Sequence, residues 1–293
     1  MKKTDYEFGM EMRLHQLNPE LHRLFSDTVF ALKKGLSSYK SIFPEYTDHT
    51  ILHSMNVIRY CNQLIGDQII RLNGDEIYIL LMSCCLHDSG MGITKKNLEA
   101  FSARIDFGDY FETHVGGSIP DMVRTFHHEF SGQFIRKYAE LLEIPSAEHE
   151  WAIIQVSRGH RKTDLMDETE YPTDFRMPNG NKVCLPYLAA LIRLADEIDV
   201  AADRNPTLLY DITTVTDKHQ IIENKMVRAV RRLLVSDSEF TLYVHTEEEE
   251  IRAQILKLAE KIQSTLDYCR TVVKNRTPYT ITQEKVLIKN ADC

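Results

Sequence analysis

The chain has few features that would bind it to a membrane or to a polyanion. Its longest apolar run, Ile77–Leu86, is about half the length of a membrane-spanning helix. The first residues are basic, but Thr4–Arg13 holds no apolar stretch of the kind that a secretory signal needs. With 35 Lys and Arg against 43 Asp and Glu, the formal net charge is −8, which argues against general binding to nucleic acids or membrane surfaces.

Cysteine is present without a pattern. The six cysteines show neither the spacing of a zinc site nor that of a disulfide framework. Two of them, Cys84 and Cys85, lie inside the apolar run and have the character of small buried hydrophobic residues. We also find no internal repeat and no low-complexity segment. These absences predict a cytoplasmic protein with reduced thiols.

The pattern of apolar residues predicts a mainly α fold with two parts. Residues 1–205 are expected to form an all-α bundle, and residues 206–293 a small α/β appendage. A polar segment, 162–182, is expected to be a substrate-side loop or lid. The predicted helices are 19–39, 48–65, 75–88, 94–104, 121–142, 148–159, 186–202 and 246–274, with a loop at 105–120 and strands at 207–216, 226–235, 239–245 and 280–288.

The pair His87-Asp88 is the most informative feature that is present. It follows the apolar run directly, and an imidazole beside a carboxylate at the end of a buried helix is costly without a partner. A divalent metal satisfies both groups, because histidine nitrogen and carboxylate oxygen are common metal ligands. A helix-terminal cap is the alternative interpretation of the pair taken alone.

Other histidines and one aspartate strengthen the metal interpretation. His49 and His53 are four residues apart and share one face of a predicted helix. The pair His127-His128 lies inside a helix, His160 lies at a helix end, and Asp196 lies on an otherwise apolar helix. A helical bundle can direct such side chains toward one internal site.

This order of residues resembles the HD superfamily of metal-dependent phosphohydrolases, over roughly Tyr46 to Arg204. The resemblance implies an HD-type helical bundle for this part of the chain. It also implies that His53, His87, Asp88 and Asp196 bind one metal. The two-metal branches use further histidines, which by position are His127 and His160.

Finer resemblances point in several directions. The segment YTDHTILHSMNV is similar to the nucleotide-phosphodiesterase form of the motif, which implies that His49 is a general acid. RTFHHEFSGQFI and LIRLADEIDVAADR resemble a bacterial branch of HD hydrolases, some of which carry an ATPase-like domain. The chain departs from the HD-GYP phosphodiesterases, because Met91 stands where they have lysine and Tyr171-Pro172 lacks the preceding glycine.

The ligand types determine the expected chemistry. Mixed His and Asp sites suit one or two Mn, Fe, Zn, Co, Ni or Mg ions, and a metal-bound water is the expected nucleophile. Asp88 is therefore predicted to be catalytic as well as a ligand, and His49 to protonate the leaving group. The cations nearest to the motifs are predicted to bind substrate phosphates, and they are Lys95, Arg158, Arg161 and Arg204.

Some roles stay open at this stage. His128 is either a metal ligand or a residue that lies behind the ligands or on the helix surface. Asp199 either orients a ligand or simply caps a helix or forms a salt bridge. His49 is either the acid or an exposed first-turn histidine. Arg204 either clamps substrate or pairs with Asp203.

The expected function is hydrolysis of a phosphoester, diester or monoester, of a nucleotide or related small molecule. The alternative is a sensor or scaffold that binds metal or nucleotide without turnover and docks a partner ATPase or defence effector. Met91 and the C-terminal appendage motivate that alternative. Homodimerisation through the appendage is a further expectation.

Overall fold

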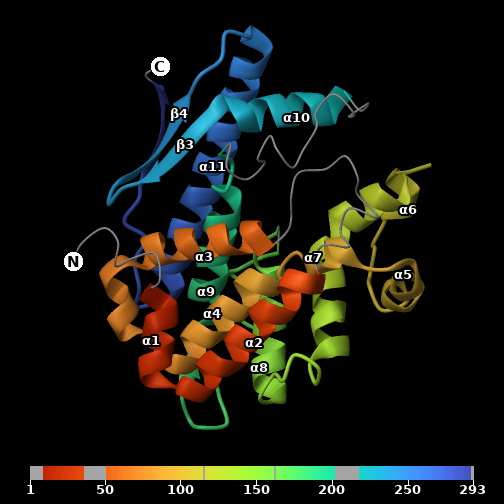
Figure 1. Ribbon diagram of the computed structural model, residues 1–293, viewed down its shortest axis with the longest axis vertical. Helices are drawn as coiled ribbons and strands as arrows, with labels where there is room; N and C mark the ends of the chain where they lie inside the picture. The colour runs from red at the N-terminus through yellow and green to blue at the C-terminus, as the bar shows by residue number, and fades with distance from the viewer. Residues whose placement is uncertain (1–8, 36–50, 115, 162, 202–217, 292–293) are drawn as a thin grey trace.

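The computed structural model describes residues 9–35, 51–114, 116–161, 163–201 and 218–291, and these form a mainly helical protein (Figure 1). The small C-terminal sheet confirms the predicted fold class. The helices of this part are α1 (Gly9–Leu17), α2 (Pro19–Gly35), α3 (Ile51–Ile65), α4 (Gly74–Leu86), α5 (Lys95–Ser102), α6 (Tyr110–Thr113), α7 (Ile119–Tyr138), α8 (Ala147–Arg158), α9 (Leu185–Glu197), α10 (Lys218–Ala229) and α11 (Glu249–Arg276). Two 3-10 helices, η3 (Gly66–Arg71) and η4 (Ser89–Gly92), and five strands, β1 (Phe175–Arg176), β2 (Lys182–Val183), β3 (Val230–Val235), β4 (Glu239–Val244) and β5 (Lys285–Asn290), complete it.

Helix α4 is the centre of the bundle. It begins with a capping box, in which the Asn73 side chain accepts from the Glu76 backbone and the Glu76 carboxylate accepts from the Asn73 backbone. Every residue from Asp75 to Leu86 is buried, because α1, α2, α3, α8 and α9 all contact this helix. A helix that is apolar on all sides needs this surrounding. The packing fixes the position of His87-Asp88, which follows directly.

The C-terminal part joins the same hydrophobic core. Helix α11 packs along α9, and its buried residues Ile255, Ile262 and Leu266 belong to one cluster with those of α4 and α9. Strands β3 and β4 form an antiparallel hairpin, while β5 is parallel to β4. A parallel pair requires a crossover, and α11 provides it. The predicted boundary at 205/206 and the predicted strand 207–216 lie outside the described residues.

Several predicted element bounds are wrong. Residues 226–229, predicted as the start of a strand, belong to α10, because Asn224 and Val227 lie on one buried helical face. The closing strand begins at Lys285 rather than 280, since Thr280 is tied to Gln68 outside the sheet. The predicted loop 105–120 contains the short helix α6.

The predicted substrate-side lid, 162–182, has its tip at the far end of the bundle. Residues 175–183 form the small β1–β2 hairpin at the lower end in Figure 1. The side-chain amides of Asn179 and Asn181 donate to Asp75 Oδ2 at 2.8 and 2.6 Å. Asp75 is in the first turn of α4, and His87 caps its other end. The tip therefore does not cover the site, and this part of the prediction is wrong.

Asp75 is expected to stabilise the fold in a pH-dependent way. Its buried carboxylate also accepts from His149 Nε2 at 3.0 Å. Burial by itself raises the pKa of Asp75, but the donors His149, Asn179 and Asn181 outweigh it and lower the pKa from 3.8 to about 2. A lowered folded-state pKa stabilises the protein above the unfolded-state value, and this contribution of about 1–2 kcal/mol is lost as pH falls from about 4 to about 2.

Asp75→Asn should therefore unfold more easily than the wild type in urea at pH 7, and the gap should narrow below pH 4. The exposed turn residue Asp237 provides the matched control, Asp237→Asn. A gap between Asp75→Asn and wild type that is the same at pH 7 and pH 3 would contradict the linkage.

In the part of the chain that the structure describes, no single helix has the length and hydropathy to cross a membrane. One bent pair of segments, Gly74–Gly92 and Lys96–Ser102 at 107°, passes that test together by length and composition. Its first segment contains the buried core helix α4.

Candidate metal centre

The peptide around His87-Asp88 is fixed by short hydrogen bonds. His87 is the C-cap of α4 and is fully buried, and its Nδ1 donates to the carbonyl of Cys84 at 3.0 Å. The hydroxyl of Ser131 on α7 donates to the His87 carbonyl at 2.5 Å and accepts from the Gly90 backbone at 2.8 Å. The end of α4 is thereby joined to α7, which carries the next histidines.

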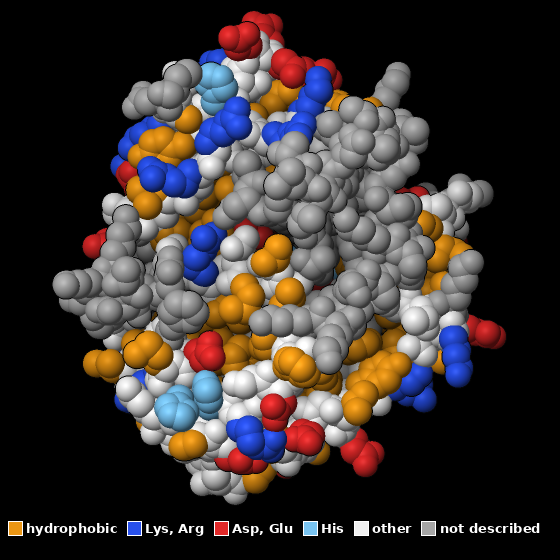
Figure 2. Space-filling model, viewed as in Figure 1, with side chains coloured by type: hydrophobic (Ala, Val, Ile, Leu, Met, Phe, Trp, Pro, Cys, Tyr) orange, Lys and Arg blue, Asp and Glu red, His pale blue; other side chains and the backbone are white. Residues whose placement is uncertain are grey.

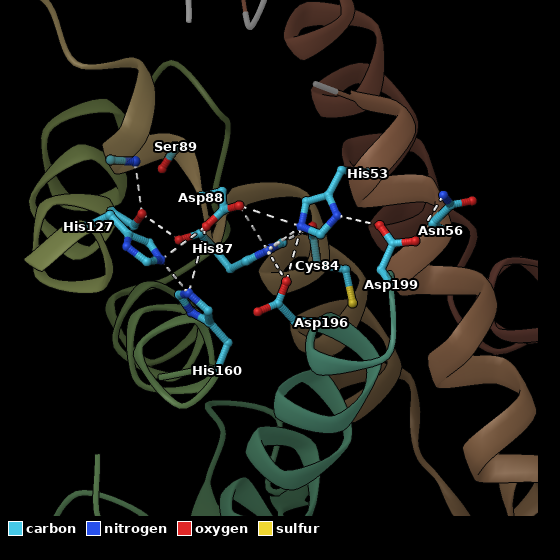
Figure 3. Close-up of polar contacts among 12 residues, drawn as sticks. His53, Asn56, Cys84, His87, Asp88, Ser89, His127, His160, Asp196 and Asp199 are labelled. Atoms are coloured by element: carbon cyan, nitrogen blue, oxygen red, sulfur yellow. Dashed lines mark hydrogen bonds and ion pairs between the residues drawn. The ribbon is translucent and has the colours of Figure 1, made fainter. Parts of the chain in front are cut away.

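One group of ligand atoms gathers on the α3 side of Asp88 (Figure 3). His53 Nε2 lies 3.2 Å from His87 Nε2 and 3.2 Å from Asp196 Oδ1. Both imidazoles lie 3.5 Å from Asp88 Oδ2. We call His53, His87, Asp88 and Asp196 the first cluster.

A second group gathers on the other side of Asp88. His127 Nε2 lies 2.8 Å from His160 Nε2, and these atoms lie 3.3 and 3.7 Å from Asp88 Oδ1. His127 comes from α7, and His160 follows α8. We call Asp88, His127 and His160 the second cluster. The two oxygens of Asp88 thus face one cluster each (Figure 3).

All four imidazoles turn Nδ1 toward a hydrogen-bond acceptor and Nε2 toward the cluster, and this determines what they can bind. Each Nδ1 faces an acceptor. Nδ1 of His53 donates to Asp199 Oδ2 at 2.6 Å, and the other three donate to the carbonyls of Cys84, Arg124 and Ser157 at 2.5–3.0 Å. A neutral ring that carries its proton on Nδ1 presents a lone pair at Nε2. Within each cluster the Nε2 lone pairs of the two imidazoles therefore point at each other. Only a cation or a proton between the two nitrogens removes this repulsion.

The distances fit a metal ion between these atoms. Ligands about 2.0–2.2 Å from a metal lie roughly 3.0–3.5 Å from each other in tetrahedral or octahedral geometry. The separations within the clusters are 2.8–3.8 Å. Nitrogen and carboxylate donors of this kind suit Mn, Fe, Zn, Co or Ni. Both clusters can hold a divalent ion.

Electrostatics keep these groups in the forms that bind metals. Burial lowers the pKa of His160 well below its usual value, and the neighbouring imidazoles of His87 and His127 lower it further. Burial by itself raises the pKa of Asp196. When the rings of His53 and His87 carry a proton in place of a metal, their hydrogen bonds and charge outweigh burial and hold that pKa well below its usual value. A neutral imidazole and an ionised carboxylate are the ligating states.

Asp199 supports His53 from behind. It is fully buried, and besides His53 it accepts from the Asn56 amide at 3.2 Å. Of the two roles left open by the sequence, the geometry favours orienting a ligand over capping a helix. The partners lie 146 positions apart, so only the folded structure brings them together.

Asp199→Ala is expected to weaken the metal affinity of the first cluster by about 10–100-fold, because His53 loses the acceptor that fixes its ring and proton. Asp199→Asn keeps an acceptor oxygen and should recover most of that affinity. Metal titration of both purified variants provides the measurement. Equal affinities of Asp199→Ala and wild type would show that the carboxylate has no part in orienting His53.

The structure separates the remaining predicted site residues. His128 belongs to neither cluster, and its Nε2 lies 3.6 Å from Glu129 Oε1. Its Nδ1 is buried without a hydrogen bond in the described structure. Burial, with His127 and Arg158 nearby, lowers its pKa to about 3. Arg158 donates to Glu129 at 2.8 Å and to Glu170 at 3.3 Å, so it is paired with acids. Its substrate-binding role stays a prediction.

Three predicted site residues lie outside what the structure describes. His49 and Arg204 are not among the described residues, and only the backbone of Lys95, in the first turn of α5, is described. The acid role of His49 and the phosphate roles of Lys95 and Arg204 stay predictions.

A cavity of about 420 Å³ opens above the clusters, and the C-terminal helices form part of its wall. Asp88, His127 and Asp196 line it, and so does Arg161, whose substrate-binding role stays a prediction. Residues from α10 and α11 line the opposite side, among them Glu223, Lys257 and Lys261. None of these residues belongs to a motif in the sequence. The four-residue spacing of Lys257 and Lys261 on one helix face was the only available signal.

Lys and Arg side chains also gather on the outer surface near β3 and α10 (Figure 2). Arg232 of β3 lies over the Tyr243 ring at 4.7 Å. These surface cations are separate from the cavity residues.

The HD-CE family model matches residues 43–279. This range holds both clusters and most of the described C-terminal part, including α10 and α11. No curated protein and no solved structure matches the chain. The match covers well over half of the 293 residues, so the chain belongs to the HD-CE family, which is related to HD domains.

Proposed function

We propose that this HD-CE protein is a two-metal phosphohydrolase that cleaves a phosphoester of a nucleotide or a related small molecule. The observation that carries the proposal is the convergence of four Nε2 lone pairs, in two clusters, on the two oxygens of one carboxylate. Two-metal sites of this kind serve in-line displacement at phosphorus, and diester cleavage is our first expectation with monoester cleavage second.

A divalent ion in each cluster would neutralise phosphoryl oxygens and lower the pKa of a water enough to attack phosphorus. The chain itself provides the arrangement. Asp88 joins the clusters and fixes their separation, while the acceptors at each Nδ1 hold the rings in place. Arg161, on the cavity wall, is available to bind a phosphoryl oxygen. His49 is our candidate to protonate the leaving group.

The cavity favours a small substrate over a polymer. Its volume lies within the range of pockets that enclose one small ligand. Apolar side chains such as Met91, Val200 and Leu258 line it together with the charged residues. An organic group such as a nucleoside can contact these side chains while its phosphate lies at the clusters. We therefore propose a soluble phosphorylated compound as the substrate.

The test combines metal analysis of the purified protein with hydrolysis of bis-p-nitrophenyl phosphate and p-nitrophenyl phosphate in added Mn. About two metals per chain together with diester cleavage would support the proposal. Bound metal with no cleavage of either ester or of a nucleotide panel would instead favour a sensor or scaffold. A protein that binds no metal would overturn the assignment of both clusters.

A further inference from the structure

Four cations line the cavity beside the clusters, and two of them come from the C-terminal part of the chain. Lys257 and Lys261 lie one turn apart on α11, while Arg124 lies on α7 and Arg161 follows α8. All four line the same cavity as Asp88 and Asp196. A cation here can interact with a substrate whose reacting group lies at the clusters.

Ion pairs account for two of these four cations. Lys261 lies 2.7 Å from Glu197, and Arg124 lies 3.5 Å from Glu223. Among the described residues, neither Arg161 nor Lys257 has a carboxylate within 4.0 Å. Two positive charges in the cavity are therefore left for a ligand.

The charge of the whole cavity indicates how many phosphates the ligand has. Two divalent ions, the carboxylates Asp88 and Asp196, and the cations Arg161 and Lys257 together leave a net charge of about four positive units. One phosphate group carries at most about two negative charges near neutral pH. A ligand with two or more phosphates balances the cavity better than a ligand with one.

We propose that Lys257, together with Arg161, forms a distal phosphate subsite, so that the preferred substrate is an organic compound with at least two phosphoryl groups. One phosphoryl group lies at the metal clusters, and a second is bound by the two cations. This inference rests on the proposed function, because it places the reacting group at the clusters. It makes Lys257, which lies outside the predicted helical domain, a residue that determines specificity.

Calorimetric binding of two inorganic probes tests the subsite without turnover. The probes are orthophosphate and linear tripolyphosphate, each saturated with Mg, added to the full-length protein. We expect tripolyphosphate to bind at least about tenfold more tightly, as one additional charge-assisted contact implies. Lys257→Gln should reduce the affinity for tripolyphosphate by about tenfold and reduce that for orthophosphate far less.

Lys274→Gln is the matched control, because Lys274 lies on the same helix but lines a different groove. Its affinities should equal those of the wild type. Equal affinity of the wild type for both probes would overturn the inference, and so would equal losses for both probes in Lys257→Gln. Either result would leave the hydrolytic activity and the metal content of the protein unchanged. If instead the proposed function fails, hydrolysis and bound metal are absent, but the ratio of the affinities for tripolyphosphate and orthophosphate can still be measured.

Discussion

Asp88→Ala is expected to remove both metal ions and to abolish hydrolysis. Each carboxylate oxygen of Asp88 faces two imidazoles, so the substitution takes one ligand from each cluster. It also removes the carboxylate that lies nearest to the four converging Nε2 atoms, so the clusters attract a cation less strongly. The loss should exceed the roughly 100-fold effect that follows when a group behind a ligand is removed. Metal content by elemental analysis and turnover of the best ester provide the measurements.

His160→Ala separates the two clusters. It removes a ligand from the second cluster only, so the protein should keep about one metal and lose the other. His114→Ala provides a control, because His114 is exposed and lies on a different helix end, outside both clusters. If Asp88→Ala kept two metals per chain, the bridging position of Asp88 would be incorrect. If His160→Ala lost both metals, the clusters would not be separable.

The sequence was sufficient to predict which residues the structure brings together in the two clusters. His87-Asp88 ends an apolar run, His53 lies on an amphipathic helix, and Asp196 interrupts an apolar one. The apolar runs and faces follow from helical periodicity, whereas the choice of ligands follows from the resemblance to the HD superfamily. The division into two clusters has no local signal, since it depends on which oxygen of Asp88 faces which helix. The same holds for the contact of Asp199 with His53.

The errors in the predicted fold have two origins, a tertiary contact that has no local signal in the sequence and a misplaced element boundary. The tip of segment 162–182 has the polar composition of a lid. Its position depends on a tertiary contact, because Asn179 and Asn181 donate hydrogen bonds to Asp75. Residues 226–229 adjoin the Val- and Leu-rich stretch 230–235, which is why the prediction extends the strand to them, but Val227 is buried on a face of α10. In the first case a tertiary contact decides the position of a polar segment, and a single sequence gives no measure of that contact. In the second case the error is one of element boundary, because Met226, Arg228 and Ala229 are themselves good helix formers.

The cationic cavity wall is a tertiary feature as well. Lys257 has no motif context, and its role follows only from the packing of α11 on α9, which brings it to the cavity that holds Asp196. The clusters therefore come from the predicted helical domain, whereas Lys257 on the cavity wall comes from the predicted C-terminal appendage.

Gly90→Ala is expected to destabilise the protein severely and to displace the second cluster. A Cβ atom at Gly90 would lie 2.3 Å from the His127 carbonyl oxygen, 2.6 Å from the Ser131 nitrogen and 2.8 Å from Phe130 Cβ. Two of these atoms belong to the backbone of α7, which cannot move away as a flexible side chain can. Overpacking in a core costs typically about 1–3 kcal/mol, and a clash with a helix backbone lies at or above the upper end.

The expected displacement of α7 links the stability of the fold to metal binding by the second cluster. Helix α7 can relieve the clash only by moving away from η4, and this movement draws His127 away from Asp88 Oδ1, now 3.3 Å distant. Gly90→Ala should therefore lose the second metal before the first, in addition to unfolding at lower urea. Gly92→Ala is the control, because a Cβ atom there meets nothing within 4 Å. A Gly90→Ala protein with wild-type stability and two bound metals would show that η4 and α7 are not in close contact, and the shared position of the two clusters would then need another explanation.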